Sequence, residues 1–465
     1  MTSARAAVAA LIVAVGLAAC STKPKSDTPT IGGTAQTTST TASKSATVSP
    51  ATGWTTYHHD AARTGVADDQ TPIGQVHKIW QSPALDGDVY AQPLVVGEHV
   101  IAATEGNSVY AFDAALGTQV WRAPLGAPVN GGSLPCGNID PSGITGTPVA
   151  DTSTNTLYVV AFLAAGTHHE LFALDLANGS VKWHRAIDPP GLAGRVEQAR
   201  GALAIAGGRV YLAYGGLLGD CGAYKGAVVS LALDGQGDMA SYVVPTTREA
   251  GIWHPGGPAV DANGDLWVST GNSESSGRFD YGNAVVRLSP QLQSLDYFAP
   301  PDWLRLNRGD TDLGSIGPAL VGTNRVVAAG KSGIAYLLDR QHLGNIGGAI
   351  TSTHACDAAA FGTAAVLGPT VFLPCTDALV AIGTTGDRLV AGWRRPGQAG
   401  PPIVAGNVVW VLDGNGTLVA LDPASGQQRF STQLGEAASR FVSMSAANGR
   451  LFVAPTNKVT AFALR

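Results

Sequence analysis

The stretch Val109-Tyr110-Ala111-Phe112-Asp113 is a short apolar strand pattern. It is followed by a turn at Gly117 and an aromatic residue at Trp121. The same order returns at residues 171–183, from Leu171 through Gly179 to Trp183. The strand part recurs six more times, beginning at Val228, Val285, Ala335, Leu379, Leu418 and Val459. A pattern that returns at intervals of about 40–60 residues indicates a repeat architecture.

Each repeat contains further strand patterns around this central one. A second apolar run lies about ten residues upstream, as at 100–102 and 157–160. A third, often opened by proline, precedes it, as at 93–96 and 148–150. The aromatic segment after the turn supplies a fourth strand. Four-stranded antiparallel units at this spacing are typical of propeller blades. We therefore predict an all-β, eight-bladed β-propeller, with a linear β-solenoid as the alternative.

The two ends of the repeat array complement each other. The last unit ends at Arg465 directly after its third strand, so it lacks an outer strand. The first unit is preceded by an extra strand pattern at residues 78–82. If this N-terminal strand completes the eighth blade, both exposed sheet edges disappear. We therefore expect the N-terminal strand to close the ring.

The N-terminus has the features of an export signal. Arg5 precedes an apolar run that is too short to span a bilayer, and Leu17-Ala18-Ala19-Cys20 follows. This ending resembles the lipobox of bacterial lipoproteins, in which Cys20 receives a diacylglyceryl group and acyl chains such as palmitate. An ordinary secretory peptide with a chance cysteine is the alternative. We predict a signal peptide over residues 1–20.

Residues 21–53 are rich in Ser, Thr, Ala and Lys and contain almost no large apolar side chain. Such a composition predicts a disordered tether, with the propeller spanning residues 54–465. The predicted location is the extracytoplasmic face of the cell membrane, held there by the lipid. The net charge of −5 gives no basis for nucleic acid binding. We expect a monomer, with an envelope protein or a small molecule as its partner.

The cysteine count agrees with export. Of five cysteines, lipidation uses one, and the remaining four allow three disulfide pairings. Cys356 and Cys375 fall before and after a hairpin of one predicted blade, so they are expected to pair. By elimination, Cys136 and Cys221 form the second disulfide. Four free thiols are the alternative.

The order Leu-Asp, Gly, Trp resembles the tryptophan-docking motif of the pyrroloquinoline quinone (PQQ) propeller superfamily. The stretch from Trp54 to Gly65 is also similar to the segment that precedes the first blade in that superfamily. The superfamily includes quinoprotein dehydrogenases, which oxidise alcohols or sugars with PQQ and a calcium or lanthanide ion. It also includes non-catalytic lipoproteins, such as a component of the outer-membrane protein assembly machine.

Three motifs resemble those of the dehydrogenases and occur in the same order. Thr270-Gly271-Asn272 is similar to the element whose Asn ligates the metal. Asp310-Thr311-Asp312 is similar to the segment that carries the catalytic base. Lys331, in Gly330-Lys331-Ser332, matches the cation that contacts the quinone. A hard cation prefers oxygen ligands, and a neighbouring carboxylate can accept a proton from an alcohol.

Other positions depart from the dehydrogenase pattern. The resemblance implies a metal-binding Glu near Cys221, where this chain has Asp220, which serves as a ligand only if the loop shifts. Trp253 is the candidate for the tryptophan beneath the quinone. Tyr90 stands at the position of an early Glu, and the vicinal disulfide that stacks on PQQ is missing. Each matched motif is also a common turn or hairpin tip.

Two functions therefore remain open. The first is a cell-envelope binding or scaffold propeller with a quinoprotein-like central pocket. The second is a PQQ- and Ca²⁺-dependent dehydrogenase of an alcohol or sugar. The two hypotheses share the same site residues and differ in whether those residues hold a metal and a quinone.

Overall fold

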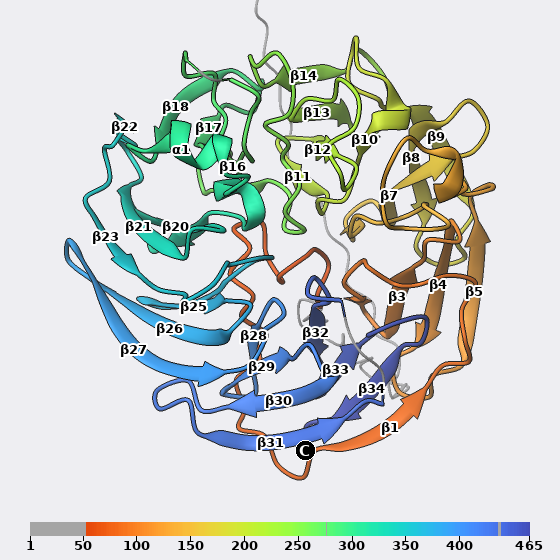
Figure 1. The fold of residues 1–465 in the computed structure, drawn as a ribbon. Coiled ribbons are helices and arrows are strands. Elements are labelled where there is room, and N and C mark those ends of the chain that lie inside the picture. The colour runs from red at the N-terminus through yellow and green to blue at the C-terminus, as the bar shows by residue number, and fades with distance from the viewer. Residues whose placement is uncertain (1–52, 276, 436–438) are drawn as a thin grey trace, which may run out of the picture. The chain divides into compact units, whose positions relative to one another are not determined.

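The computed structural model describes residues 53–275, 277–435 and 439–465. These residues form an all-β, eight-bladed propeller, as the repeat predicted (Figure 1). Because the first strand pairs with the last, the blades form a closed ring and the linear solenoid is excluded. The predicted signal peptide with Cys20, and the predicted tether up to residue 52, lie outside the described residues.

Each blade is a sheet of antiparallel strands that mostly follow one another in chain order. The exceptions are β22, which pairs parallel with β18 in the fourth blade, and β1, which joins β34 in the eighth. The first blade contains β2 (Leu94–Val96), β3 (His99–Ala103), β4 (Ser108–Asp113) and β5 (Gln119–Pro124), and the second contains β6 (Val149–Asp151), β7 (Thr156–Leu163), β8 (His168–Asp175) and β9 (Val181–Ala186). The third contains β10 (Glu197–Gln198), β11 (Ala204–Ala206), β12 (Arg209–Gly216), β13 (Ala227–Ala232) and β14 (Ala240–Val243). The fourth contains β15 (Ala259–Val260), β16 (Leu266–Ser269), β17 (Val285–Leu288), β18 (Ser294–Ala299) and β22 (Asn345–Ile346).

The fifth blade contains β19 (Ala319–Val321), β20 (Arg325–Ala328), β21 (Ile334–Asp339) and β23 (Thr351–His354), and the sixth contains β24 (Ala365–Leu367), β25 (Thr370–Pro374), β26 (Ala378–Thr385) and β27 (Arg388–Pro396). The seventh contains β28 (Ile403–Ala405), β29 (Val408–Leu412), β30 (Thr417–Leu421) and β31 (Gln428–Gln433). The eighth contains β32 (Met444–Ala447), β33 (Arg450–Val453), β34 (Thr460–Ala463) and β1 (His77–Gln81). The helical elements are α1 (Trp303–Arg308), η1 (Gly131–Ser133), η2 (Gly194–Val196) and η3 (Leu313–Ser315). None of the helices in the described ranges is long and apolar enough to cross a membrane.

Burial falls from the middle strands to the outer strand of a blade. In the first blade, every residue of β4 except Asp113 is buried, whereas β5 alternates between exposed and buried residues. The apolar faces of neighbouring blades pack against each other, so the core lies between the sheets rather than within one sheet. Several first strands contact one another around the centre, as β2 and β32 do. The loops at the ends of these strands therefore meet near the axis of the ring.

A tryptophan of one blade docks on a glycine turn of the next. The indole of Trp80 covers Gly117, where an added Cβ would lie 2.6 Å from the ring. Its Nε1 donates to the carbonyl oxygen of Ala114 at 3.1 Å. Gly117 has a φ of +72°, which a side chain would also strain. This geometry explains why Gly and Trp recur at fixed offsets in the repeat. Further pairs of this kind are Trp121–Gly179, Trp183–Gly235 and Trp393–Gly426.

The N-terminal strand closes the ring, as predicted. Strand β1 pairs antiparallel with β34, with His77 opposite Ala463 and Gln81 opposite Thr460. In Figure 1 the two strands lie beside each other at the rim of the ring. Trp80 of β1 also lies 5.9 Å from Phe452 of the eighth blade, measured between ring centroids. Strand β1 therefore joins the eighth blade to the first.

The segment from Trp54 to Ala67 connects several blades, which the repeat alone did not predict. Its backbone forms hydrogen bonds with residues at or next to the first strands β2, β6, β15, β24 and β28. Buried Arg63 adds a side-chain bond from Nη2 to the carbonyl oxygen of Leu203 at 2.8 Å. Residues far apart along the chain are thereby held to one short segment. We infer that this segment stabilises the whole ring.

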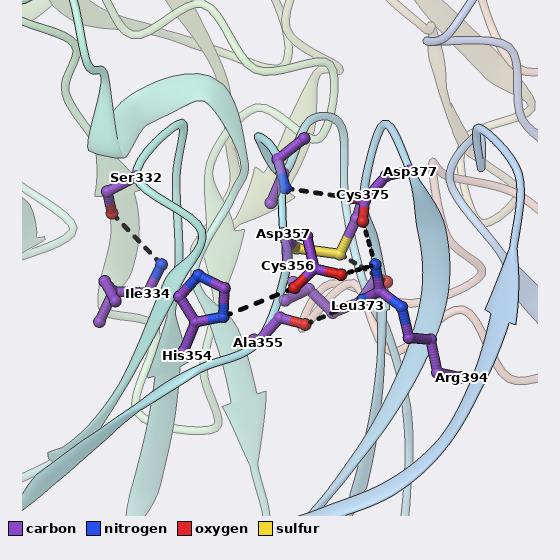
Figure 2. The surroundings of a disulfide bond; sticks show 12 residues. Ser332, Ile334, His354, Ala355, Cys356, Asp357, Leu373, Cys375, Asp377 and Arg394 are labelled. Carbon is purple, nitrogen blue, oxygen red and sulfur yellow. Dashed lines mark hydrogen bonds and ion pairs between the residues drawn. A yellow bond between two sulfur atoms is a disulfide. The ribbon is translucent and has the colours of Figure 1, made fainter.

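Both disulfides have the predicted pairing. The expectation that Cys356 and Cys375 belong to one blade was wrong, because Cys356 follows β23 of the fifth blade and Cys375 follows β25 of the sixth. This disulfide lies beside the ion pair of Arg394 and Asp357 (Figure 2). Cys136 and Cys221 join two long loops of different blades. The second disulfide therefore holds together two loops that lie near the candidate functional site.

Candidate functional site

All six residues predicted for the cofactor, metal and catalytic roles line one cavity of about 300 Å³, here called the main pocket: Asp220, Trp253, Asn272, Asp310, Asp312 and Lys331. They lie on loops of the third, fourth and fifth blades. Asn272 follows β16, and Lys331 follows β20. The three motifs that were singled out in the sequence therefore line one pocket in the structure.

Glycines allow the three motifs to approach one another. A Cβ on Gly271 would lie 2.5 Å from Oδ1 of Asp312, and one on Gly330 would lie 2.4 Å from the Asp312 carbonyl oxygen. A Cβ on Gly314 would likewise meet the backbone of Thr270 at 2.4 Å. The backbone N–H of Lys331 donates to the carbonyl oxygen of Asp312 at 2.8 Å. The three motifs are thus one packed unit, which explains why a glycine stands in or just after each of them.

A buried ion pair is at the centre of this unit. Nζ of Lys331 lies 2.5 Å from Oδ2 of Asp312, whose side chain is 4% exposed. The other oxygen of Asp312 accepts the backbone N–H of Asn272 at 2.6 Å. Lys331 also contacts Asp310 at 2.8 Å, but that carboxylate is 67% exposed. Both carboxylate oxygens of Asp312 therefore have partners within the protein.

Burial and ion pairing act in opposite directions on the pKa values of Asp312 and Lys331. Burial raises the pKa of Asp312, because the charged form loses its hydration, while the Lys331 ammonium opposes this shift. Burial alone would lower the pKa of Lys331. The carboxylates of Asp312 and Asp310 outweigh it, so the pKa of Lys331 lies above its usual value. The lysine therefore remains cationic at neutral pH and compensates the buried carboxylate.

The remaining carboxylates near the pocket also have partners. Oδ1 of Asp220 accepts the hydroxyl of Tyr224 at 2.5 Å. Glu249, which sequence reasoning missed, has one oxygen 2.7 Å from Arg248 and the other 3.4 Å from the Asn272 amide nitrogen. Burial raises the pKa of Glu249, and Arg248 opposes that shift. Each of these carboxylates thus has a hydrogen-bond or ion-pair partner within the protein.

Aromatic and cationic side chains form the other side of the main pocket. The ring centroid of Trp253 lies 6.1 Å from that of Phe361 and 6.3 Å from that of Phe441. The cationic groups of Arg200 and Lys331 each lie 5.9 Å from the Trp253 ring, a distance typical of cation–π contacts. Arg200, Phe361 and Phe441 were not predicted. They lie in loops outside the repeated strand pattern, so no sequence signal pointed to them.

The donor groups do not form a calcium site as they stand. Calcium takes about six to eight oxygen ligands. Within the described ranges, no group of three His, Cys, Asp or Glu side chains could hold a metal ion. Asp312 is bonded to Lys331, and Asp220 is bonded to Tyr224. The predicted ligands Asn272 and Asp220 do line the same pocket, but one amide and one carboxylate bring too few oxygen atoms for calcium.

The residues present fit a quinone better than a metal. PQQ is a planar aromatic molecule with carboxylate groups. Trp253 offers an aromatic face, and Lys331 and Arg200 offer positive charge beside it. These three residues would hold such a molecule, and the quinone itself would supply redox chemistry. The chain's own residues contribute orientation and charge compensation.

Comparison with known sequences decides the family. The sequence profile of the family described as outer membrane protein assembly factor BamB matches residues 30–219 and 376–464. The chain belongs to this family of PQQ-like propellers. No curated protein matches the sequence significantly. The family match covers the first blades and the last ones, and the predicted site motifs at 270–272, 310–312 and 330–332 fall between its two parts.

Solved structures of both kinds of relative share the fold. Quinohemoprotein alcohol dehydrogenase from Comamonas testosteroni is 17% identical, with a TM-score of 0.69, over 89% of this chain and 80% of that one. A europium-containing methanol dehydrogenase is 13% identical, with a TM-score of 0.68, over 89% and 98%. BamB from Moraxella catarrhalis is 16% identical, with a TM-score of 0.56, over 84% and 98%. At these identities the similarity is one of fold.

Proposed function

We propose that this PQQ-like propeller is a cell-envelope lipoprotein that binds a small molecule in the main pocket. The observation that carries the proposal is the convergence of Asp220, Trp253, Asn272, Asp312 and Lys331 on one cavity. Cavities that combine an aromatic wall with a few polar groups are typical sites for small ligands. The ring is a rigid scaffold for the loops, which is where binding residues usually lie.

The hydrogen bond and the ion pair of Asp312 favour ligand binding over substrate oxidation as the function of the pocket. A general base must be able to accept a proton from its substrate. Both oxygens of Asp312 are instead bonded within the protein, one to Lys331 and one to the backbone of Asn272. Asp310 is the more accessible carboxylate, but it is paired with Lys331. The pocket is therefore better suited to hold a ligand than to deprotonate an alcohol.

A dye-linked oxidation assay tests this proposal. The purified protein is incubated with PQQ and CaCl₂ and then mixed with an electron-accepting dye and a panel of alcohols and sugars. We expect no substrate-dependent reduction of the dye, because Asp312 is paired and the described residues contain no calcium ligand set. Turnover that requires both PQQ and calcium would replace the binding role with the second candidate function.

That second candidate is a PQQ-dependent alcohol or sugar dehydrogenase. The placement of Lys331 beside Trp253, with Asp310 and Asp312 in contact with the same ammonium, favours it. In this function Lys331 and Trp253 would hold the quinone, and one aspartate would accept the proton of the substrate. It requires Asp312 to exchange its partners when the ligands bind.

Membrane attachment is expected to depend on Cys20, which lies outside the described residues. The Cys20→Ala variant should move from the membrane fraction to the soluble fraction, because two acyl chains anchor a protein firmly and one does not. Fractionation followed by immunoblotting measures this. A Ser21→Ala variant is the matched control and should stay with the membrane. A Cys20→Ala protein that remains bound after a salt wash would place the anchor elsewhere.

An envelope protein is the alternative partner in this proposal. The description of the family as an outer membrane protein assembly factor supports it. In that case the propeller, acting as a monomer, would serve as a scaffold, and the main pocket would accommodate a group of the partner. Substitutions in the pocket would then weaken protein capture rather than small-molecule binding.

A further inference from the structure

A second cavity of about 150 Å³, here called the side cavity, adjoins the main pocket. The two share the lining residues Asn138, Arg200, Arg440 and Phe441. A ligand in the main pocket can therefore extend into the side cavity past the two arginines. The residues that line the side cavity include no Asp and no Glu. Its charged lining groups are all cationic.

Arg200 lacks a full set of partners. Its Nε is buried and has no hydrogen-bond partner among the described residues, while Nη2 donates to Oε1 of Gln198. Burial lowers the pKa of the Arg200 guanidinium, and the nearby carboxyl of Glu105 opposes that shift. Arg200 forms no ion pair within the described residues, so an anion beside its partly buried guanidinium would be stabilised.

Glu105 is only a partial counter-ion for Arg200. It is 2% exposed, and its Oε2 accepts the backbone N–H of Gly143 at 2.6 Å. Burial raises the pKa of Glu105 to about 7. The Glu105 carboxyl is therefore not fully charged at neutral pH. Arg200 retains positive charge that Glu105 does not balance.

Arg440 supplies a second cation, and hydroxyl groups add donors. Its guanidinium lies 4.7 Å from the ring centroid of Phe361 and forms no ion pair within the described ranges. Thr145, Ser439 and Tyr90 also line the side cavity. Burial raises the pKa of Tyr90, and Glu105 adds to that shift, so its hydroxyl stays protonated. Two guanidinium groups and several hydroxyls surround one small volume.

We propose that Arg200 and Arg440 form an oxyanion subsite, which binds a carboxylate or phosphate group of a ligand whose aromatic body lies in the main pocket. Guanidinium groups bind both anions through paired, charge-assisted hydrogen bonds. Phe441 lines both cavities, so the aromatic body and the anion can belong to one molecule. This proposal rests on the proposed binding function and names the class of ligand.

Calorimetric titration with four probes tests it: 2-naphthoate, 2-naphthyl phosphate, uncharged 2-naphthamide and inorganic phosphate. The protein is used as purified, together with the variants Arg200→Gln and Arg440→Gln. Arg388→Gln, an exposed arginine of β27, is the matched control. Circular dichroism and melting temperature verify that each variant is folded. Arg440 is exposed, so its variant remains informative if Arg200→Gln fails to fold.

We expect an aryl anion to bind more tightly than the amide, and each pocket variant to weaken that anion by roughly tenfold, the effect of losing a charged hydrogen bond. The control should change nothing, and amide binding should stay constant in all variants. Stronger binding of naphthoate would identify a carboxylate ligand, and stronger binding of the phosphates a phosphate ligand. Equal binding of naphthoate, naphthyl phosphate and the amide would overturn the subsite alone. Absence of binding by every probe would overturn both the subsite and the proposed binding function.

Discussion

Replacing β1 with a flexible linker is expected to open the ring and cause aggregation. The change substitutes residues 77–81 with a Gly/Ser linker of equal length, so the segment from Trp54 to Ala67 stays in place. The edge of β34 would then lose its partner strand, and exposed edges pair with other chains. The variant should elute as aggregates in size-exclusion chromatography and lose its cooperative thermal transition.

Two further variants make this test specific. Trp80→Ala keeps the backbone pairing of β1 but removes the docking on Gly117. It should lower the free energy of unfolding by about 3 kcal/mol, the low end for a Trp→Ala change, because Trp80 is half-buried. A chain that begins at Trp54 is the control and should melt like the full protein. A linker variant that remains monomeric with an unchanged melting temperature would contradict closure by β1.

Lys331→Ala is expected to destabilise the fold strongly at neutral pH. It removes the ammonium that lies 2.5 Å from the buried carboxylate of Asp312. Leaving one partner of a buried ion pair alone costs about 3–5 kcal/mol. Chemical denaturation at pH 7 measures this loss. Asp310→Asn, which removes only the exposed partner of Lys331, should cost less than about 1 kcal/mol and is the matched control.

The loss in Lys331→Ala should depend on pH in a defined direction. Without the lysine, burial raises the pKa of Asp312 in the folded state further above its value in the unfolded chain. A raised folded-state pKa favours folding at low pH, and this contribution is lost as the pH rises through that pKa. The stability deficit of the variant should therefore shrink between pH 7 and pH 4.5. Lys331→Ala/Asp312→Asn should recover most of the loss, and an equal deficit at every pH would contradict the account.

The fold was largely predictable because the signal is local and repeated. Several blades place an apolar strand, a glycine turn and an aromatic residue at similar offsets, and the docking of Trp121 on Gly179 gives the physical reason. The pairing of β1 with β34 followed from counting strands. Strand β22, which pairs parallel with β18, and helix α1 were not predicted, because they lie in two separate segments outside the repeat, after β21 and after β18.

The site was predictable only in part. Three motifs could be recognised because they occur in the same order as in the dehydrogenases, and they converge on the main pocket: Thr270-Gly271-Asn272, Asp310-Thr311-Asp312 and the one with Lys331. The direct pairing of Lys331 with Asp312 depends on side-chain geometry that a motif does not contain. Arg200 and Arg440 were missed because they approach each other only through the closed ring, from residues 240 positions apart. Non-local contacts of this kind leave no pattern in a single sequence.

Calorimetric titration of PQQ into the purified protein, once with EDTA and once with calcium, tests the central claim most directly. The claim is that the main pocket binds a planar anionic ligand through its own cations, without a metal ion. Lys331 and Arg200 already lie beside the aromatic face of Trp253. The account predicts binding of similar affinity in both buffers. Binding that appears only with calcium, together with substrate oxidation, would contradict it.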